Sequence, residues 1–382
     1  MHSLPDVFPV TTIYLDFPAT TPLDSRVFER MRPWLGPPAN PHAVQHAYGR
    51  AAANAVEDAA RQVSEATGAP LGGVIFTPGA SFANNQIIRS FARPGEAIVT
   101  TVLEHPSVIS PVRESAAVGA TVIECPTDSN GIVDSEYVME RAENASLVSV
   151  MAVNNEIGTI QAVHDIARYC AALDIPFHCD ASQALGRIDL GELASNALVT
   201  LSSHKIYGPS GIGAICGPDR LTEQLKPLVT GGGQQRSLVA GTIPTALCVG
   251  FAQACELAAA ETKADWDHAT RMSACFRDNL KACSASFVPN VDLALAVPHI
   301  LSLRFPGVDA EALLGAVPEI AAATGSACRS GALAGSPVLR GLGFSQPDVG
   351  ATIRFGFGRT STADEATCAA ELVATALARI AR

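Results

Sequence analysis

Phe177-His178-Cys179-Asp180 and Ser202-Ser203-His204-Lys205-Ile206-Tyr207-Gly208-Pro209 are the two segments that decide the fold of this chain. An apolar run that predicts a buried strand leads into each, and a charged side chain, Asp180 or Lys205, stands where the strand ends. In open α/β sheets, ligands bind beyond the carboxyl ends of the strands. Pyridoxal phosphate (PLP) chemistry needs a lysine that forms a Schiff base and a carboxylate that keeps a pyridine nitrogen protonated. Together the two residues predict a PLP site, whereas either one alone also fits a loop lysine or a helix-capping aspartate.

The surrounding sequence predicts an α/β fold. Short apolar runs rich in β-branched residues recur along the first half of the chain, with helical segments such as 51–67 and 166–173 between them. The runs cover residues 74–76, 97–100, 121–123, 147–150, 176–179 and 198–201. This alternation is typical of a mainly parallel sheet with helices on both faces.

The pattern changes after about residue 250. A long Ala-rich helical stretch is followed by strand-like runs at 300–305 and 353–355 and by an amphipathic helix at 363–382. We therefore expect a large PLP-binding domain over 26–250 and a smaller α+β domain over 251–382. The N-terminal segment, 1–25, is expected to pack with the small domain.

Composition narrows the function classes. The chain has 382 residues, is 48% hydrophobic and carries a net charge of −11, so it can bury two cores and does not predict a broad nucleic-acid-binding surface. It contains no apolar run of about 18 residues and no signal-peptide pattern, which favours a cytoplasmic protein without membrane partners. None of its ten cysteines is spaced C-x-x-C, so we expect free thiols and no metal site.

Polar clusters follow several of the predicted strands. The segment Thr77-Pro78-Gly79-Ala80-Ser81 opens a helix, where Gly79 allows close backbone approach and Ser81 can donate to a phosphate or simply cap the helix. His105 is a candidate for stacking on a flat cofactor or for acid/base chemistry, or is a loop histidine without a role. Asn155 fits a hydrogen bond to a phenolic oxygen or a substrate carboxylate, or an Asx-turn.

Further candidates lie near the two charged residues. Gln183 stands about one helical turn beyond Asp180, so both can face the same ligand. Ser202 and His204 flank the lysine and are candidates for binding phosphate. A Gly-rich loop that ends in Gly241-Thr242 offers a further donor to the same group.

One cysteine stands apart from the others. Cys328 lies among small residues in Thr324-Gly325-Ser326-Ala327-Cys328-Arg329-Ser330-Gly331, next to Arg329. Access to solvent and a neighbouring cation are what a reactive thiolate needs. A buried cysteine near a turn is the alternative.

Taken together, these motifs resemble the NifS/IscS-type cysteine desulfurases, PLP enzymes of the class V aminotransferase family. The resemblance covers nearly the whole chain and rests on motifs that occur in the same order. They are Ala19-Thr20-Thr21-Pro22, Asn154-Asn155-Glu156-Ile157-Gly158, Asp180-Ala181-Ser182-Gln183, Ser-His-Lys-x-x-Gly-Pro ending in Gly211-x-Gly213, Gly325-Ser326-Ala327-Cys328 and Arg354-Phe355. The implied fold is PLP-dependent transferase fold type I, a mainly parallel seven-stranded sheet with a smaller α+β domain.

The resemblance implies a role for each candidate near the cofactor. Lys205 would bind PLP as a Schiff base and move the Cα proton, Asp180 would pair with the pyridinium nitrogen, and His105 would stack on the ring. Gln183 would hydrogen-bond the phenolic oxygen, with Asn155 near the substrate carboxylate. The phosphate would be bound by Gly79, Ala80, Ser81, Ser202 and His204, and by Thr242 from the neighbouring subunit of a homodimer.

The same resemblance implies the reaction. Arg354 would clamp the carboxylate of L-cysteine, and Cys328 would take the sulfur as a persulfide while alanine leaves. The sulfur would pass to an acceptor protein for iron–sulfur cluster assembly or another thio-modification pathway. The alternatives are a selenocysteine lyase or a related PLP lyase or aminotransferase of the same fold, and a scaffold that only binds partners.

Three positions depart from the family pattern. Phe82 stands where Glu is common after the phosphate-binding residue, Val239 where Arg precedes x-Gly-Thr, and Gly356 where Ser is common. These departures affect the rim of the predicted pocket and leave its central residues intact.

Overall fold

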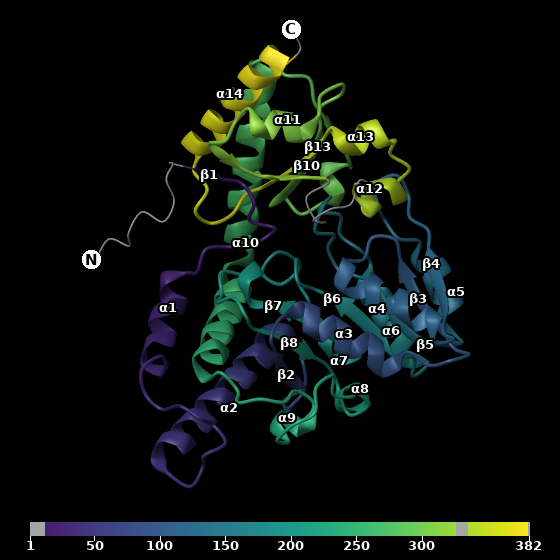
Figure 1. Ribbon diagram of the computed structural model, residues 1–382, viewed down its shortest axis with the longest axis vertical. Coiled ribbons are helices and arrows are strands. Elements are labelled where there is room, and N and C mark those ends of the chain that lie inside the picture. Colours follow the sequence, from purple (N-terminus) through teal and green to yellow (C-terminus); the bar gives the residue numbers. More distant parts are fainter. Residues whose placement is uncertain (1–11, 326–334, 381–382) are drawn as a thin grey trace. The chain divides into compact units, whose positions relative to one another are not determined.

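The computed structural model describes residues 12–325 and 335–380 of the chain, and Figure 1 labels their helices and strands. The chain divides into two compact units. The larger unit comprises Thr20–Asn155 and Thr159–Lys263, and the smaller one comprises residues 12–19, Glu156–Gly158 and the described chain from Ala264 onward. Each unit has its own cluster of buried apolar side chains.

The larger unit is built on a seven-stranded sheet. Its strands are β2 (Val74–Thr77), β3 (Ala97–Thr101), β4 (Thr121–Cys125), β5 (Ala145–Ser149), β6 (Phe177–Asp180), β7 (Leu198–Ser202) and β8 (Gly213–Cys216). Their order is β2-β8-β7-β6-β5-β3-β4. Only β8 runs antiparallel to its neighbours, so the predicted mainly parallel sheet of seven strands is confirmed. No strand was predicted at β8, because its four residues include Gly and Ala, which have low β-propensity.

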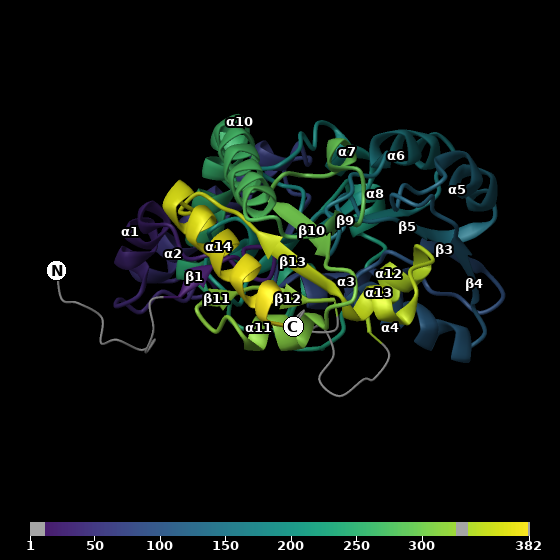
Figure 2. The ribbon, with the colours of Figure 1, turned by 90° about the horizontal axis from the view of Figure 1, so that it is seen from above.

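Helices cover both faces of this sheet (Figure 2). On one face α3 (Ala80–Phe91) packs on α4 (Pro106–Ala117), and on the other α6 (Val163–Ala172) packs on α5 (Ser135–Ala142) and α7 (Leu193–Asn196). Ile87 and Phe91 of α3 are fully buried in one cluster with side chains from the strands beneath. The remaining helices of this unit are α1 (Ser25–Met31), α2 (Ala47–Thr67), α8 (Asp219–Thr222) and α9 (Gln234–Ser237).

The exposed edge of the sheet, strand β2, is covered by a side chain. The amide of Gln235 accepts a hydrogen bond from the backbone N–H of Phe76 and donates one to the carbonyl oxygen of the same residue, both at 2.7 Å. Gln235, Arg236 and Ser237 all have positive φ, between 45° and 65°. This costs backbone energy in residues other than glycine, and the paired amide helps to hold the turn against the strand.

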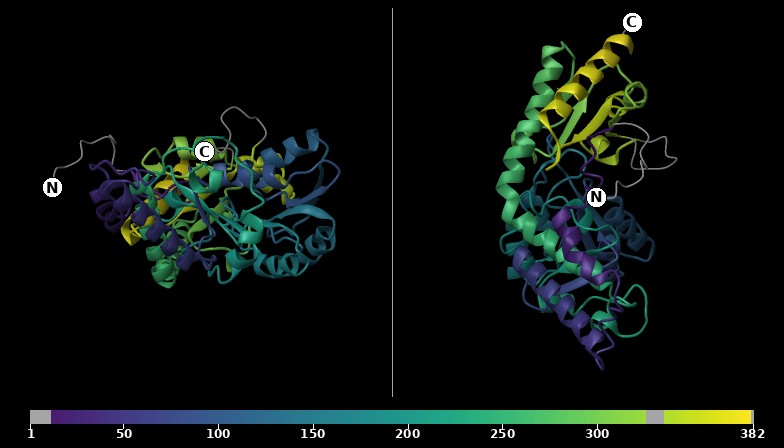
Figure 3. Two further views of the ribbon diagram at one scale, coloured as in Figure 1. Left: turned by 90° about the horizontal axis from the view of Figure 1, so that it is seen from below. Right: turned by 90° about the vertical axis from the view of Figure 1, so that its left-hand side faces the viewer.

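The smaller unit combines a four-stranded antiparallel sheet with helices. Its sheet contains β9 (Val288–Pro289), β10 (Ile300–Arg304), β12 (Ala323–Thr324) and β13 (Thr352–Gly356), in the order β12-β13-β10-β9. The helices are α11 (Ala310–Gly315), α12 (Pro337–Gly341), α13 (Gln346–Gly350), α14 (Ala363–Ile380) and the second part of α10 (Thr245–Ala282). Helices α10 and α14 pack on the strands (Figure 3), where Phe276 meets Phe355 at 4.7 Å between ring centroids.

The N-terminal segment belongs to the smaller unit. Strand β1 (Ile13–Tyr14) pairs in parallel with β11 (Ile320–Ala321), and the backbone N–H of Gly356 donates to the carbonyl oxygen of Leu15 at 2.6 Å. The units divide after Ala19 and at Lys263, whereas the sequence-based boundaries lay at 25 and 250. The second boundary falls inside the continuous helix α10, so no turn residue in the sequence marks it. Within the described ranges, no helix has the length and apolarity to cross a membrane.

Gly356, one of the departures from the family pattern, has a local structural reason. A Cβ atom at this position would lie 2.1 Å from Cδ of Pro18 and 3.0 Å from the backbone nitrogen of Phe17. The N-terminal segment therefore occupies the space that a side chain would need. The other two departures, Phe82 and Val239, both pack in the apolar cluster under α3.

We predict that Gly356→Ala destabilises the protein by about 1–3 kcal/mol, because overfilling a packed site forces the backbone or Pro18 to move. Urea unfolding of the full chain measures the effect. Gly315→Ala is the matched control, since a Cβ atom there meets no atom within 4 Å. Adding Pro18→Ala to Gly356→Ala should restore part of the loss. A Gly356→Ala protein as stable as the wild type would contradict the close approach.

Candidate functional site

The predicted site residues of the larger unit gather where its strands end. Asp180 is the last residue of β6, and Lys205 closes the 3-10 turn η2 (Ser203–Lys205) that follows β7. The two strands are in register, with Asp180 opposite Thr200. His105 lies at the start of α4, after β3, and Gly79 at the start of α3, after β2. Because these strands point the same way, their carboxyl ends form one edge, as expected for a ligand site in an open α/β sheet.

The Asp180 carboxylate is buried and hydrogen-bonded on both oxygens. Its side chain accepts from Asn84 Nδ2 at 2.7 Å and from the backbone N–H of Ser182 at 2.9 Å. Only 5% of Asp180 is exposed. A buried carboxylate must find such donors or a cation, and the two donors also fix its orientation.

His105 is a neutral, oriented side chain. Its Nδ1 accepts from the backbone N–H of Ser107 at 3.1 Å and lies 2.7 Å from the hydroxyl of the same residue. Burial lowers the pKa of His105, Asp180 opposes that change, and the positive charge of Lys205 adds to it. These influences show that the histidine, the carboxylate and the lysine lie within electrostatic reach of one another.

The Lys205 segment is held by residues from the start of the unit. The hydroxyl of Thr21 donates to the carbonyl oxygen of His204 at 3.0 Å and accepts from the backbone N–H of Tyr207 at 2.7 Å. Arg187 donates to the carbonyl oxygen of Lys205 at 2.8 Å. Burial and the lysine charge lower the pKa of His204 to about 4, so this histidine is neutral at pH 7.

The start of α3 suits an anionic group. Gly79 adopts φ 145°, a conformation that other residues rarely adopt, and no side chain caps the helix N-terminus. The first N–H groups of the helix, from Ala80 and Ser81, are therefore available to a ligand. A Cβ atom on Gly213 would lie 3.1 Å from the backbone of Gly79, so β8 passes close behind this turn.

The donor set fits PLP. A buried carboxylate, a lysine and a neutral histidine stand at one sheet edge with an uncapped helix N-terminus, and these match the pyridine nitrogen, the aldehyde carbon, the ring and the phosphate. Ser202 and Gln183 are buried at the same strand ends, and Asn155 lies in the loop after β5.

Two further predicted residues lie on other elements. Arg354 lies on β13 of the smaller unit, where its guanidinium pairs with Asp16 at 2.7 Å. Thr242 is exposed in the loop before α10 and lines a cavity of about 130 Å³ with Thr77 and Gly241. Cys328 lies outside the described residues.

Several residues of the site were not predicted from the sequence. Asn84 and Ser107 carry no charge and have no motif of their own, so only their contacts reveal them. Thr21 lies in the Ala19-Thr20-Thr21-Pro22 motif, but its part in holding the lysine segment is seen only in its contacts. His178 was noted only as part of an apolar strand. Glu104 directly precedes His105 in the sequence. A carboxyl group between an apolar run and a candidate histidine is a pattern that could have predicted a buried acid beside the site.

Glu104 is a buried carboxylic acid beside the site. It accepts from the backbone N–H of Met151 at 2.7 Å and from the hydroxyl of Thr101 at 3.2 Å. Burial raises the pKa of Glu104 to about 8, with a smaller contribution from the negative charge of Asp180. The group is therefore mostly protonated at pH 7 and links the end of β3 to the chain after β5.

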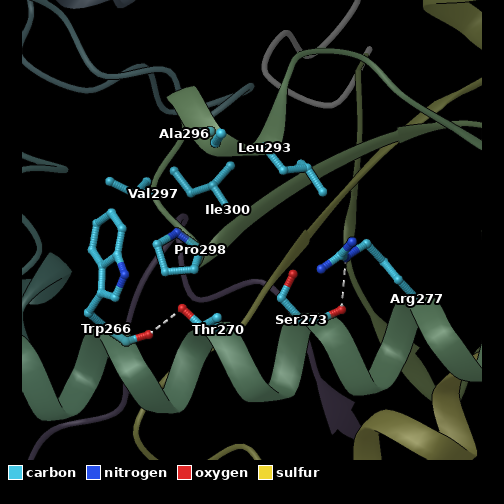
Figure 4. A pocket seen from close by; sticks show the side chains of 10 residues that line it. Trp266, Thr270, Ser273, Arg277, Leu293, Ala296, Val297, Pro298 and Ile300 are labelled. Carbon is cyan, nitrogen blue, oxygen red and sulfur yellow. Dashed lines mark hydrogen bonds between the residues drawn. The ribbon is translucent and has the colours of Figure 1, made fainter.

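A separate pocket of about 210 Å³ lies in the smaller unit, between α10 and residues 293–300 (Figure 4). Trp266, Leu293, Val297, Pro298 and Ile300 are among its apolar lining residues, and Arg277 stands at one end. None of the predicted site residues lines it. In the parts of the chain that the structure describes, no cluster of three or more His, Cys, Asp or Glu side chains could hold a metal ion.

The fold and this site define a class of PLP-type α/β proteins, and comparison with known sequences gives the family. Residues 13–367 match the family described as aminotransferase class-V, and the chain belongs to it. It is 37% identical over 377 residues to "Cysteine desulfurase IscS" of Rickettsia prowazekii (strain Madrid E), covering 97% of this chain and 92% of that protein.

Two further comparisons agree. The chain is 39% identical over 370 residues to "Cysteine desulfurase" of Homo sapiens, covering 94% of this chain and 81% of that protein. A solved structure described as a NifS-like protein superposes with a TM-score of 0.87 at 28% identity, covering 96% of this chain and all of that one. The predicted family and fold class are confirmed.

We predict that Glu104→Gln changes how stability depends on pH. A carboxyl whose pKa is raised on folding contributes stability at low pH that is lost as pH rises from about 4.5 towards 8. Glutamine has no proton to lose, so the free energy of unfolding should fall less steeply with pH in the variant, by up to about 1.4 kcal/mol per pH unit.

Denaturant unfolding between pH 5 and 9 measures this slope. Glu114→Gln serves as the control, because that carboxylate is exposed on α4 and pairs only with the exposed Arg89. Equal slopes in Glu104→Gln and wild type would show that Glu104 is already ionised at low pH.

Proposed function

We propose that this protein is a PLP-dependent cysteine desulfurase that converts L-cysteine to L-alanine and carries the sulfur as a persulfide on Cys328. The observation that carries the proposal is the group formed by Asp180, Lys205 and the neutral His105 at the carboxyl edge of the sheet. The names of relatives that cover nearly the whole chain support the substrate.

The larger unit supplies the residues that would hold PLP. Asp180 would pair with the pyridine nitrogen, and Lys205 would form the covalent link. Gln183 would hydrogen-bond the phenolic oxygen, and Asn155 would lie near the substrate carboxylate. The phosphate would be bound by Gly79, Ala80 and Ser81 at the start of α3 and by Ser202 and His204. When bound, PLP supplies an electron sink that stabilises negative charge on the substrate Cα.

The chain's own groups handle the protons. Lys205, once free of the cofactor, accepts the proton from Cα of cysteine. His105 and His204 are neutral near Lys205, since burial and the lysine charge both lower their pKa values. Neutral rings add no positive charge beside the lysine, so they do not oppose its protonation.

Arg354 is the proposed partner of the substrate carboxylate. A guanidinium can bind a carboxylate through two parallel hydrogen bonds. In this structure one of its terminal nitrogens already bonds Asp16, which orients the side chain on β13. The Asp16 carboxylate is then also a competitor that substrate binding must outweigh.

Cys328 is the proposed sulfur carrier. Its thiolate attacks the sulfur of cysteine, an S–S bond forms, and the Cβ–S bond breaks. The electron pair of the broken bond stays with the carbon fragment, which takes up a proton at Cβ and leaves as alanine. The persulfide then passes to an acceptor protein, for iron–sulfur cluster assembly or another thio-modification pathway.

The other cysteines are poor candidates for this role. Burial raises the pKa of the thiols of Cys125, Cys170, Cys179, Cys216, Cys248 and Cys255. A protonated, buried thiol is neither nucleophilic nor accessible. The described thiols that remain are the half-buried Cys275 and the exposed Cys283 and Cys368.

We further propose that the protein works as a homodimer. Five large apolar side chains stand exposed between residues 23 and 48, namely Leu23, Phe28, Leu35, Val44 and Tyr48. Exposed apolar side chains in one stretch of chain favour an interface with a partner. Thr242, exposed in its loop, would reach the phosphate of the other subunit.

The experiment that tests the proposal measures alanine and sulfide released from L-cysteine by the purified protein with PLP. L-selenocysteine and other amino acids are offered in parallel. Alanine formed from L-cysteine supports a desulfurase. Turnover of selenocysteine alone would establish the selenocysteine lyase, and transamination would establish an aminotransferase.

We predict that Lys205→Ala abolishes both turnover and the covalent attachment of PLP. Borohydride reduction followed by peptide mass spectrometry locates the attached cofactor in the wild type on the peptide that contains Lys205. Lys226→Ala, at another lysine of the same unit, should leave both unchanged. Attachment of PLP to a different lysine would overturn the assignment.

We predict that Cys328→Ser still binds PLP but forms no alanine and carries no extra sulfur after brief incubation with L-cysteine. Peptide mass spectrometry of the wild type should place the added sulfur first on Cys328. Cys368→Ser, which removes an exposed thiol of α14, is the control and should behave as wild type. Rapid alanine release by Cys328→Ser would show that the reaction needs no protein thiol.

A further inference from the structure

Asn84, on the buried side of α3, joins several groups at the edge of the sheet. It is fully buried, and its Nδ2 lies 2.7 Å from Asp180 Oδ2 and 2.9 Å from Ser107 Oγ. Its Oδ1 lies 3.2 Å from Nε2 of His178. One amide thus contacts the carboxylate directly and reaches His105 through Ser107.

The direction of each hydrogen bond follows from the available protons. An amide nitrogen only donates, and a carboxylate only accepts, so Asn84 donates to Asp180 and, with its second N–H, to Ser107 Oγ. The backbone N–H of Ser107 donates to His105 Nδ1, so the proton of the neutral ring is on Nε2. The Ser107 hydroxyl therefore donates to Nδ1 as well.

The orientation of the Asn84 amide in turn fixes the tautomer of His178. Burial lowers the pKa of His178 to about 4, so its ring is neutral and carries one proton. Because Asn84 Oδ1 can only accept, that proton is on Nε2, and Ser149 Oγ donates to Nδ1 at 2.8 Å. A flipped amide would set its oxygen against the Asp180 carboxylate.

We propose that Asn84 is a positioning residue that orients the Asp180 carboxylate and, through Ser107, holds His105 with its proton on Nε2. The inference rests on the proposed function, in which Asp180 and His105 face PLP. One side chain then sets the state of both groups, with His178 and Ser149 behind it.

Gln86, two residues further along α3, is a buried amide that contacts no residue of the site. Gln86 is also fully buried, and its amide donates to the carbonyl oxygens of Lys226 and Leu238. These bonds tie α3 to the chain after α8 and involve no residue of the site. Gln86 thus provides a matched comparison for a buried amide whose role is structural.

The test uses the full-length protein and the variants Asn84→Asp and Ser107→Ala, with Gln86→Glu as the control. Asn84→Asp keeps the shape and the acceptor for His178 but loses both donors. We expect its dissociation constant for PLP to rise about 10- to 100-fold at pH 8, the effect of losing a hydrogen bond to a charged group. The loss should shrink as pH falls, because the introduced carboxyl can donate once it is protonated.

The second readout is the ¹⁵N chemical shift of His105 Nδ1, assigned by its loss in His105→Gln. It should move in Asn84→Asp, where the Ser107 hydroxyl turns to the new carboxylate, and in Ser107→Ala, where the hydroxyl is gone. Ser107→Ala should leave PLP affinity within about threefold of wild type, since Asn84 still donates to Asp180. Gln86→Glu should change neither readout.

Wild-type PLP affinity in Asn84→Asp, or an unchanged His105 shift in that variant, would overturn the inference. If Asn84→Asp does not fold by circular dichroism, Asn84→Ala replaces it, with the same expected rise but no recovery at low pH. If the wild-type protein binds no PLP, the proposed function fails, while the His105 shift still tests the hydrogen-bond direction.

Discussion

The structure of the site depends on one constraint, the burial of the Asp180 carboxylate at the end of a central strand. A charge with 5% exposure has to be satisfied by fixed donors, and here these come from α3 and from the turn after β6. The helix must therefore lie close over the strand ends, which also brings its uncapped N-terminus to the same edge. The proposed places for the phosphate and for the ring nitrogen of PLP are consequences of the same packing.

Protonation states follow from this arrangement. The buried histidines around the carboxylate stay neutral, because burial outweighs the attraction of the single negative charge. Glu104 instead keeps its proton, since burial raises its pKa and the negative charge of Asp180 would repel a second carboxylate. Glu104 and the two histidines are therefore uncharged neighbours of Asp180.

The sequence predicted the parts of this arrangement that have a strong local signal. Alternating apolar runs indicated the strands, and Asp180 and Lys205 stood out as a pair, because both end apolar runs and polar motifs surround them. Strand β8 has no such signal, since it is only four residues long. The domain boundary inside α10 has none either, since it lies within an unbroken helix. Asn84 and Thr21 act through partners far away in the sequence, so only the fold reveals their roles. The reason for Gly356 likewise lies in Pro18, which the chain brings to it from its other end.

The six buried thiols have a consequence for an enzyme that handles reactive sulfur. Sulfur held as a persulfide exchanges readily with other thiolates, and a protein with ten cysteines offers many wrong destinations. Burial keeps Cys125, Cys170, Cys179, Cys216, Cys248 and Cys255 protonated and out of reach. The fold therefore prevents these six thiols from exchanging with the persulfide, so its sulfur can pass to an acceptor outside the protein. The same burial would protect these positions from peroxide, so oxidative damage should spare the core.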